Sequence, residues 1–129
     1  MRLVVIESPY AGDVDLNTAY ARLCLADSLA RGESPIASHL LYTQPGVLDD
    51  LVPAERALGI CAGFAWAQHA AAIAVYTDLG ISGGMTEALR RYRRAGRLIE
   101  GRTLRDSPAL AALFAHLRKG PDHQGPQHD

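Results

Sequence analysis

The densest group of residues that could carry chemistry lies in the segment YTDLGISGGMTE, which runs from Tyr76 to Glu87. An apolar run ends just before Asp78, a glycine- and serine-rich turn follows, and a helical pattern then begins with Glu87 in its first turns. In an open α/β sheet such a junction lies at the carboxyl end of a strand, where ligands bind. The helix end also favours anions through its unpaired N–H groups and its dipole.

This segment supplies two candidate catalytic carboxylates, Asp78 and Glu87, and a candidate ligand-binding turn, Ser82, Gly83 and Gly84. Structural interpretations stand beside these. Asp78 and Ser82 are residue types that also satisfy loop N–H groups. Glu87 follows Gly84 by three positions, which is also the spacing of a helix-capping acid.

Two other loops carry polar or aromatic groups that we expect at the same edge. Ser8, Pro9 and Tyr10 follow the first apolar run, and His39 and Tyr42 lie in the loop after the second. We take all five as candidate ligand-binding residues, because sites in this architecture are assembled from several loops. Their structural interpretations are ring packing for Tyr10 and a partly buried hydrogen bond for His39.

The elements that must position these groups alternate between strands and helices. The expected strands are 3–6, 35–38, 71–76 and a fourth that begins at 97–99 and could reach 104; the expected helices are 16–30, one that begins at Pro53, 84–95 and 109–117. This alternation predicts an α/β fold with a parallel sheet of four to five strands, helices on both faces and a flavodoxin-like strand order. Residues 39–50 are expected to form a loop.

Length and composition favour one globular domain. The chain has 129 residues, of which 48% are hydrophobic, 21% charged and 6% aromatic. We expect residues 1–118 to form that domain and residues 119–129 to be a disordered tail. The few aromatic residues and the net charge of −1 argue against binding of a nucleic acid polymer.

Neither the cysteines nor the histidines show metal-binding spacing, so we expect no metal and no cofactor. Cys24 and Cys61 lie in apolar helical patterns and are expected to be buried free thiols.

The first apolar run is interrupted by Glu7, which is typical of a strand rather than a signal peptide. With no apolar stretch of membrane-spanning length, a cytoplasmic protein without a membrane partner is expected. Rossmann, P-loop and nucleophile-elbow motifs are all absent.

Charge is divided unevenly along the chain. Residues 1–82 contain four arginines against nine acids, and residues 83–129 contain nine basic residues against five acids. A solvated helix face explains the basic region around residues 90–105 most simply. Contact between the acidic and basic parts of neighbouring subunits is the alternative, and we predict a homo-oligomer.

Four segments of the sequence, taken together, resemble the nucleoside 2-deoxyribosyltransferase-like superfamily, in particular its small uncharacterised phage and actinobacterial members. They are SPYAG at 8–12, Asn17 with YAR at 20–22, SHLLY at 38–42 and YTDLGIS-x-GM at 76–85. The resemblance covers residues 3–104. It implies a flavodoxin-like fold, a nucleoside or nucleotide ligand and assemblies of two or more subunits.

In that superfamily a glutamate attacks the anomeric carbon and a second acidic group or water helps the base to leave. By resemblance, Glu87 would be the nucleophile and Asp78 the acid or a sugar-orienting group, and the Ser82–Gly84 turn could hold a hydroxyl or a 5′-phosphate. The nucleophile of the superfamily lies about one helical turn after the turn glycine. Counted from Gly83 that position is Glu87, and counted from Gly84 it is Ala88.

Three functions therefore follow from the sequence as hypotheses. The first is an N-glycosidase or deoxyribosyltransferase that acts through a carboxylate. The second is a nucleotide-binding module without catalysis, and the third is an oligomeric scaffold with a vestigial pocket.

Overall fold

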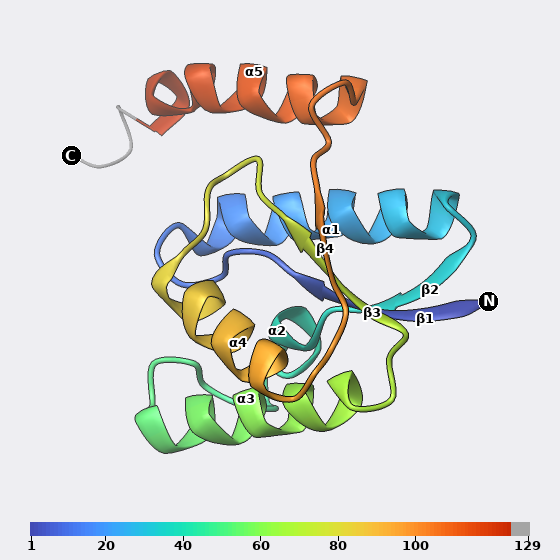
Figure 1. The fold of residues 1–129 in the computed structure, drawn as a ribbon. Helices are drawn as coiled ribbons and strands as arrows, with labels where there is room; N and C mark the ends of the chain where they lie inside the picture. The colour runs from blue at the N-terminus through green and yellow to red at the C-terminus, as the bar shows by residue number, and fades with distance from the viewer. Residues whose placement is uncertain (125–129) are drawn as a thin grey trace.

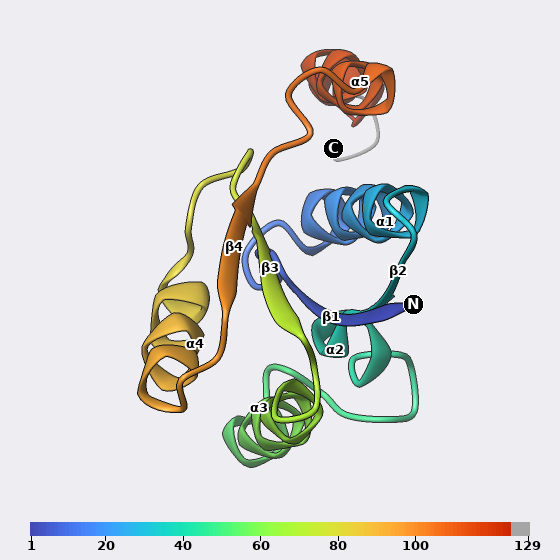
Figure 2. The same cartoon turned by 45° about the vertical axis from the view of Figure 1, so that its right-hand side comes forward.

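A four-stranded parallel sheet with helices on both faces forms the body of the protein (Figures 1 and 2). The computed structural model describes the backbone of residues 1–124 and side chains as far as Leu117. In chain order the elements are β1 (Arg2–Glu7), α1 (Val14–Ala30), β2 (Glu33–Ile36), α2 (Ser38–Leu41), α3 (Pro53–Ala67), β3 (Ala72–Tyr76), α4 (Gly83–Arg94), β4 (Ile99–Arg102) and α5 (Pro108–Gln124).

The strand order β2-β1-β3-β4 is flavodoxin-like and confirms the predicted fold class. β1 is central: Val5 pairs with Ile36 of β2 on one side and with Ile73 of β3 on the other. Helix α1 covers one face of the sheet, with α5 packed against α1 on the same side, while α3 and α4 cover the other face (Figure 2). After β2 the chain crosses to the other side of β1 to form β3, so the carboxyl ends of β1 and β3 form the switch point at which ligands bind in such sheets.

Alternation along β1 divides the core into two clusters. Val4 and Ile6 pack with Tyr20 and Cys24 of α1, and Val5 packs on the other face with α3 and α4. Successive side chains of a strand point to opposite faces, so the continuous apolar run serves both layers.

Some predicted boundaries are confirmed and others are wrong. α1 ends at Ala30, as predicted, before Gly32, where φ is +84°. It begins two residues earlier than predicted, after Asp13, whose Oδ1 accepts a hydrogen bond from the Leu16 N–H at 3.2 Å. The strand predicted at 35–38 is displaced: β2 begins at Glu33, which pairs in register with Arg2 of β1, and ends at Ile36. The expected loop at 39–50 instead opens with α2.

The end of the chain and one cysteine also differ from expectation. α5 continues beyond the predicted end at 117 as far as Gln124; the rest of the predicted tail, residues 125–129, lies outside the described residues. Cys24 is a buried free thiol, as predicted, but Cys61 is exposed. No helix in the described part of the chain is long and apolar enough to cross a membrane, and the cytoplasmic location remains a prediction.

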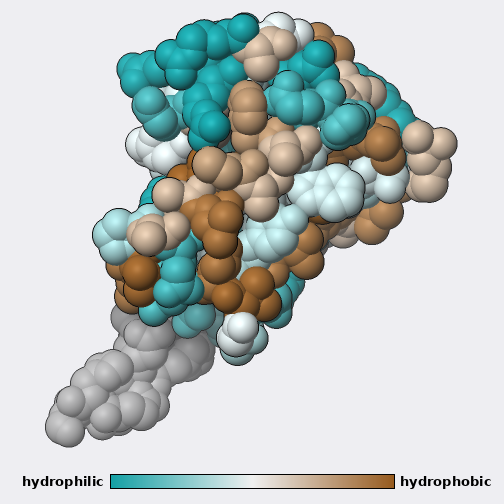
Figure 3. All heavy atoms as spheres, turned by 90° about the horizontal axis from the view of Figure 1, so that it is seen from below, coloured by the Kyte–Doolittle hydropathy of each residue, from teal (hydrophilic) through white to brown (hydrophobic). Residues whose placement is uncertain are grey.

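The outward side of α3 is unusually apolar. We call it the α3 stripe; its residues, all exposed, are Ala54, Ala57, Leu58, Cys61 and Ala65. Ala57 and Cys61 also lie at the edge of the cavity described below. Seen from the α3 side, apolar surface runs across the middle of the molecule beside a strongly hydrophilic band (Figure 3).

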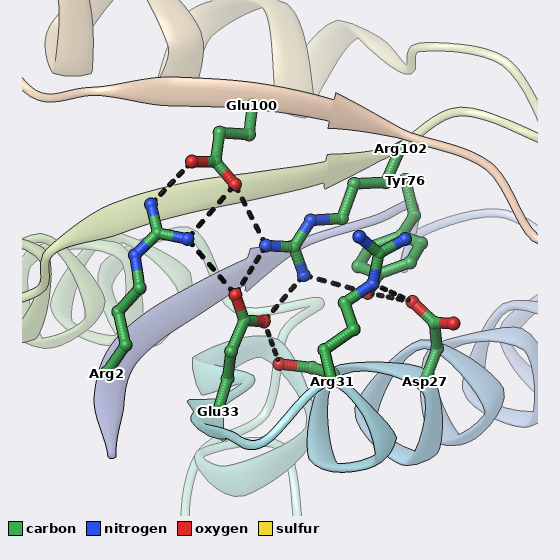
Figure 4. Close-up of polar contacts among 8 residues, drawn as sticks. Arg2, Asp27, Arg31, Glu33, Tyr76, Glu100 and Arg102 are labelled. Carbon is green, nitrogen blue, oxygen red and sulfur yellow. Dashed lines mark hydrogen bonds and ion pairs between the residues drawn. The ribbon is translucent and has the colours of Figure 1, made fainter.

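A buried ion pair joins the two edge strands across the centre of the sheet (Figure 4). Arg102 of β4 donates two hydrogen bonds, from Nη1 and Nη2, to the two carboxylate oxygens of Glu33 of β2, each 2.7 Å long. Only 4% of the Arg102 side chain is exposed. Ser28 of α1 donates to the same carboxylate at 2.8 Å, and Arg2 and Glu100 extend the network toward solvent. These bonds lower the pKa of Glu33 to about 2.

We predict that Glu33→Gln lowers the free energy of unfolding at pH 7 by about 3 kcal/mol, because it leaves a buried guanidinium without its bidentate partner. The stabilisation from ionised Glu33 is complete above its usual pKa of 4.5 and is lost as the pH falls toward about 2. Urea unfolding between pH 3 and 7 measures both effects. Glu87→Gln is the control, because its pair with Arg90 is long (3.4 Å) and exposed. Equal stability of wild type and Glu33→Gln at pH 7 would contradict the prediction.

Candidate functional site

A cavity of about 750 Å³ opens at the carboxyl ends of β1 and β3, between α2, α3 and the first turns of α4. Its volume lies in the range of small-molecule sites. Eight of the ten sequence-predicted site residues line it: Ser8, Tyr10, His39, Tyr42, Ser82, Gly83, Gly84 and Glu87. Three separate segments therefore converge on one cavity: the loop after β1, the α2 region and the start of α4.

Ser8 and His39 form a hydrogen-bonded pair in the cavity wall. Ser8 Oγ lies 2.8 Å from His39 Nε2, and the ring of Tyr10 meets the imidazole edge-on at 6.4 Å between centroids. Burial lowers the pKa of His39 to about 4, so the imidazole is neutral at pH 7. A base of such low pKa activates a serine poorly, and the pair is better suited to hydrogen-bonding a neutral ligand.

A glycine brings the helix that carries His39 close to α3. A Cβ atom added to Gly63 would lie 2.4 Å from Ser38 Oγ and 2.9 Å from Ser38 Cβ. No side chain fits there, so Gly63 sets the distance between α3 and α2. The next residue after Ser38 is His39, so this contact also positions the imidazole.

The amino end of α4 forms another wall. Ser82 Oγ accepts a hydrogen bond from the Met85 N–H at 3.2 Å and caps the helix. The guanidinium of Arg56 from α3 lies over Gly84, where an added Cβ would be 3.2 Å from Nη2. Arg56 is itself held by Asp50 at 2.8 Å. A cation beside a helix N-terminus gives this wall a positive character.

Glu87 lies at the rim of the cavity rather than deep inside it. Its side chain is 62% exposed and its carboxylate pairs with Arg90 at 3.4 Å. Ala88, the next residue, also lines the cavity and packs against the apolar cluster under α4.

Pro9 and Asp78 do not line this cavity. The Asp78 carboxylate accepts hydrogen bonds from the Tyr20 hydroxyl at 2.6 Å and from the Leu104 N–H at 2.8 Å. Its own N–H donates to Tyr20 Oη at 2.9 Å. Asp78 thus ties the end of β3 to α1 and to the segment after β4, and this placement does not support the acid role expected from the sequence.

Comparison with known proteins assigns a family. Residues 2–102 match the family described as Domain of unknown function (DUF7768). The chain belongs to the DUF7768 family. A search of curated proteins found no match.

Among solved structures, this DUF7768 protein is similar to a 2-deoxyribosyltransferase from the psychrotolerant bacterium Bacillus psychrosaccharolyticus. The TM-score is 0.56, the sequence identity is 13%, and the match covers 79% of this chain and 72% of the other. At this identity the likeness shows the fold, which agrees with the flavodoxin-like strand order.

The DUF7768 cavity also contains an acid that the sequence did not identify as functional, Glu7 at the end of β1. Tyr92 of α4 donates a hydrogen bond to Glu7 Oε2 at 2.7 Å, and burial raises the pKa of Glu7 to about 7. The signal was present in the sequence, because an acid two positions after Val5 must share its face of the strand. Within the described part of the chain, no three His, Cys, Asp or Glu residues gather to hold a metal ion.

Replacing Gly63 tests how the histidine is positioned. We predict that Gly63→Ala lowers the free energy of unfolding by about 1–3 kcal/mol, because the new methyl group collides with Ser38. Gly59→Ala, one turn earlier in α3, is the control: its nearest neighbour is the flexible end of Leu48 at 3.3 Å. That variant should be neutral, or more stable by up to about 1 kcal/mol, because alanine favours helix. Urea unfolding of both variants measures the difference, and equal stabilities would contradict the close approach.

Proposed function

We propose that the cavity binds a nucleoside or nucleotide and that the protein cleaves its N-glycosidic bond. The observation that carries the proposal is the convergence of Ser8, His39 and Glu87, from three separate segments of the chain, on one cavity. The fold, similar to that of a 2-deoxyribosyltransferase, supports the same substrate class. His39, Ser8 and Tyr10 offer neutral hydrogen-bonding and aromatic contacts suited to a base.

Cleavage requires a carboxylate near the anomeric carbon. As the bond from C1′ to the base nitrogen breaks, its electron pair leaves with the base and positive charge develops on the sugar. Glu87 would stabilise that charge and form a bond to C1′, which water then hydrolyses. If a second nucleoside base replaces water, the same intermediate gives transfer. Arg56 and the amino end of α4 suit a 5′-phosphate or hydroxyl.

Binding without turnover is the second candidate, and the position of Glu87 favours it. Its carboxylate is mostly exposed and paired with Arg90, while Ala88 occupies the neighbouring cavity position. A carboxylate at the rim must turn inward, away from Arg90, before it can reach a sugar.

Release of free base separates these functions. We expect wild type to release base from at least one member of a panel of deoxynucleosides and nucleoside monophosphates, measured by chromatography. Glu87→Gln should reduce the rate by a factor of about 100 or more, since it removes the nucleophile. Asp106→Asn, an exposed change outside the cavity, is the matched control and should retain the rate.

Three results would revise the proposal. Release that persists in Glu87→Gln excludes Glu87 as the nucleophile. A nucleotide-dependent rise in melting temperature without release of base supports binding alone. If no member of the panel releases base or raises the melting temperature, the hypothesis of an oligomeric scaffold with a vestigial pocket is favoured.

We also propose that the protein forms a homo-oligomer through the α3 stripe, because exposed apolar surface of this kind marks association sites. Light scattering at micromolar concentration should give at least twice the chain mass of 13.9 kDa. Leu58→Glu places a charge in the stripe and should yield monomers. Leu98→Glu, at a similarly exposed leucine before β4, should not (60% and 55% exposed). A wild-type monomer would contradict the proposal.

A further inference from the structure

Glu7 is the acid most deeply set in the cavity. It ends β1, where it pairs in register with Val75 of the central strand β3. Its side chain shares the face of Val5, against the cluster that contains Met85, Leu89 and Tyr92 of α4. A carboxyl group in such surroundings is largely desolvated, yet it still lines the cavity.

Its hydrogen bonding leaves one carboxyl oxygen for a ligand. Tyr92 donates to Oε2 at 2.7 Å, and no other described residue hydrogen-bonds to the carboxyl group. The ring of Tyr92 is itself fixed, stacked on Phe64 at 5.7 Å. Oε1 is thus free to carry a proton toward the cavity while Oε2 is held.

Burial, rather than the charges of the cavity wall, allows Glu7 to keep that proton. From α4, the Arg91 guanidinium lies over the Phe64 ring at 4.5 Å, from α3 Arg56 is paired with Asp50 at 2.8 Å, and from α2 His39 is neutral. Desolvation dominates over the bond from Tyr92, so the pKa of Glu7 lies at about 7. Glu87, by contrast, is exposed at the rim. Two carboxyl groups in one cavity, one desolvated and one in water, are the arrangement that divides acid from nucleophile in glycosidic cleavage.

We propose that Glu7 is the general acid that protonates the leaving base. This inference rests on the proposed function and replaces Asp78, which does not line the cavity and whose Oδ2 accepts hydrogen bonds from both Tyr20 and Leu104. As the bond from C1′ to the base breaks, its electron pair passes to the base, and Glu7 Oε1 gives its proton to an acceptor nitrogen or oxygen of that base. Glu7 becomes a carboxylate held by the Tyr92 hydroxyl. In the later hydrolysis, water bonds to C1′ through its oxygen, Glu87 leaves as a carboxylate, and the proton of the water returns to Glu7. The substrate class is therefore a nucleoside or nucleotide whose base must be protonated in order to leave.

The test compares Glu7→Gln with wild type on two substrates. One is an ordinary purine deoxynucleoside, and the other is its N7-methylated form, whose positively charged base leaves without a proton. We expect Glu7→Gln to lose a factor of about 100 or more in kcat on the first substrate, the scale of general acid catalysis, and to keep its rate on the second. The glutamine keeps the acceptor for Tyr92 and the size of the side chain, and melting temperatures confirm folding.

The pH profile gives a second readout. In wild type, kcat/KM should fall as the pH rises through about 7, since the acid form is lost. Tyr92→Phe should move that fall to higher pH, because the hydrogen bond that favours the Glu7 carboxylate is gone. If Glu7 had only a structural role, kcat/KM would not fall near pH 7, and Tyr92→Phe would not displace the pH profile.

Other outcomes reject either the acid role of Glu7 or the proposed function. Equal losses on both substrates, or no loss on either, reject Glu7 as the acid while cleavage stands. Absence of base release by wild type from both substrates rejects the proposed function and the acid role together.

Discussion

The ion pair between Arg102 and Glu33 is the interaction on which the arrangement of the sheet depends. These residues belong to the two edge strands, β4 and β2, and their contact passes over both central strands. A charged pair so deeply buried is stable only when its hydrogen bonds are complete, and here Ser28, Glu100 and Arg2 complete them. It spans β1 and β3, the central strands whose carboxyl ends open onto the cavity.

The same type of side chain is used in opposite ways on the two faces of the sheet. Glu33 lies among arginines, which hold its pKa at about 2, and Glu7 lies among apolar side chains, which raise its pKa to about 7. The first is a permanent anion that stabilises the fold. The second exchanges its proton near neutral pH, and it lies where a ligand would bind. Environment rather than residue type thus separates structure from chemistry in this protein.

The fold was predictable from sequence because the alternation of strands and helices and the start of α3 at Pro53 are local signals. Most of the cavity followed from the topology, because loops after parallel strands meet at one edge. What could not be predicted depended on contacts distant in the chain. Asp78 is held by Tyr20, 58 positions away, and the short helix α2 is set by its contact with Gly63. Glu7 appeared to be only the end of a strand, because its partner Tyr92 lies 85 positions away.

The central place of β1 has a consequence for synthesis on the ribosome. β1 pairs with β2 soon after both have emerged, but its other edge has no partner until β3, ending at Tyr76, has been made. The contact between Arg102 and Glu33 spans 69 positions and waits longer still. An unpaired strand edge attracts other chains. The nascent chain therefore exposes one edge of an apolar strand until β3 has left the exit tunnel, and the sheet is complete only when β4, at the end of the matched region 2–102, has followed.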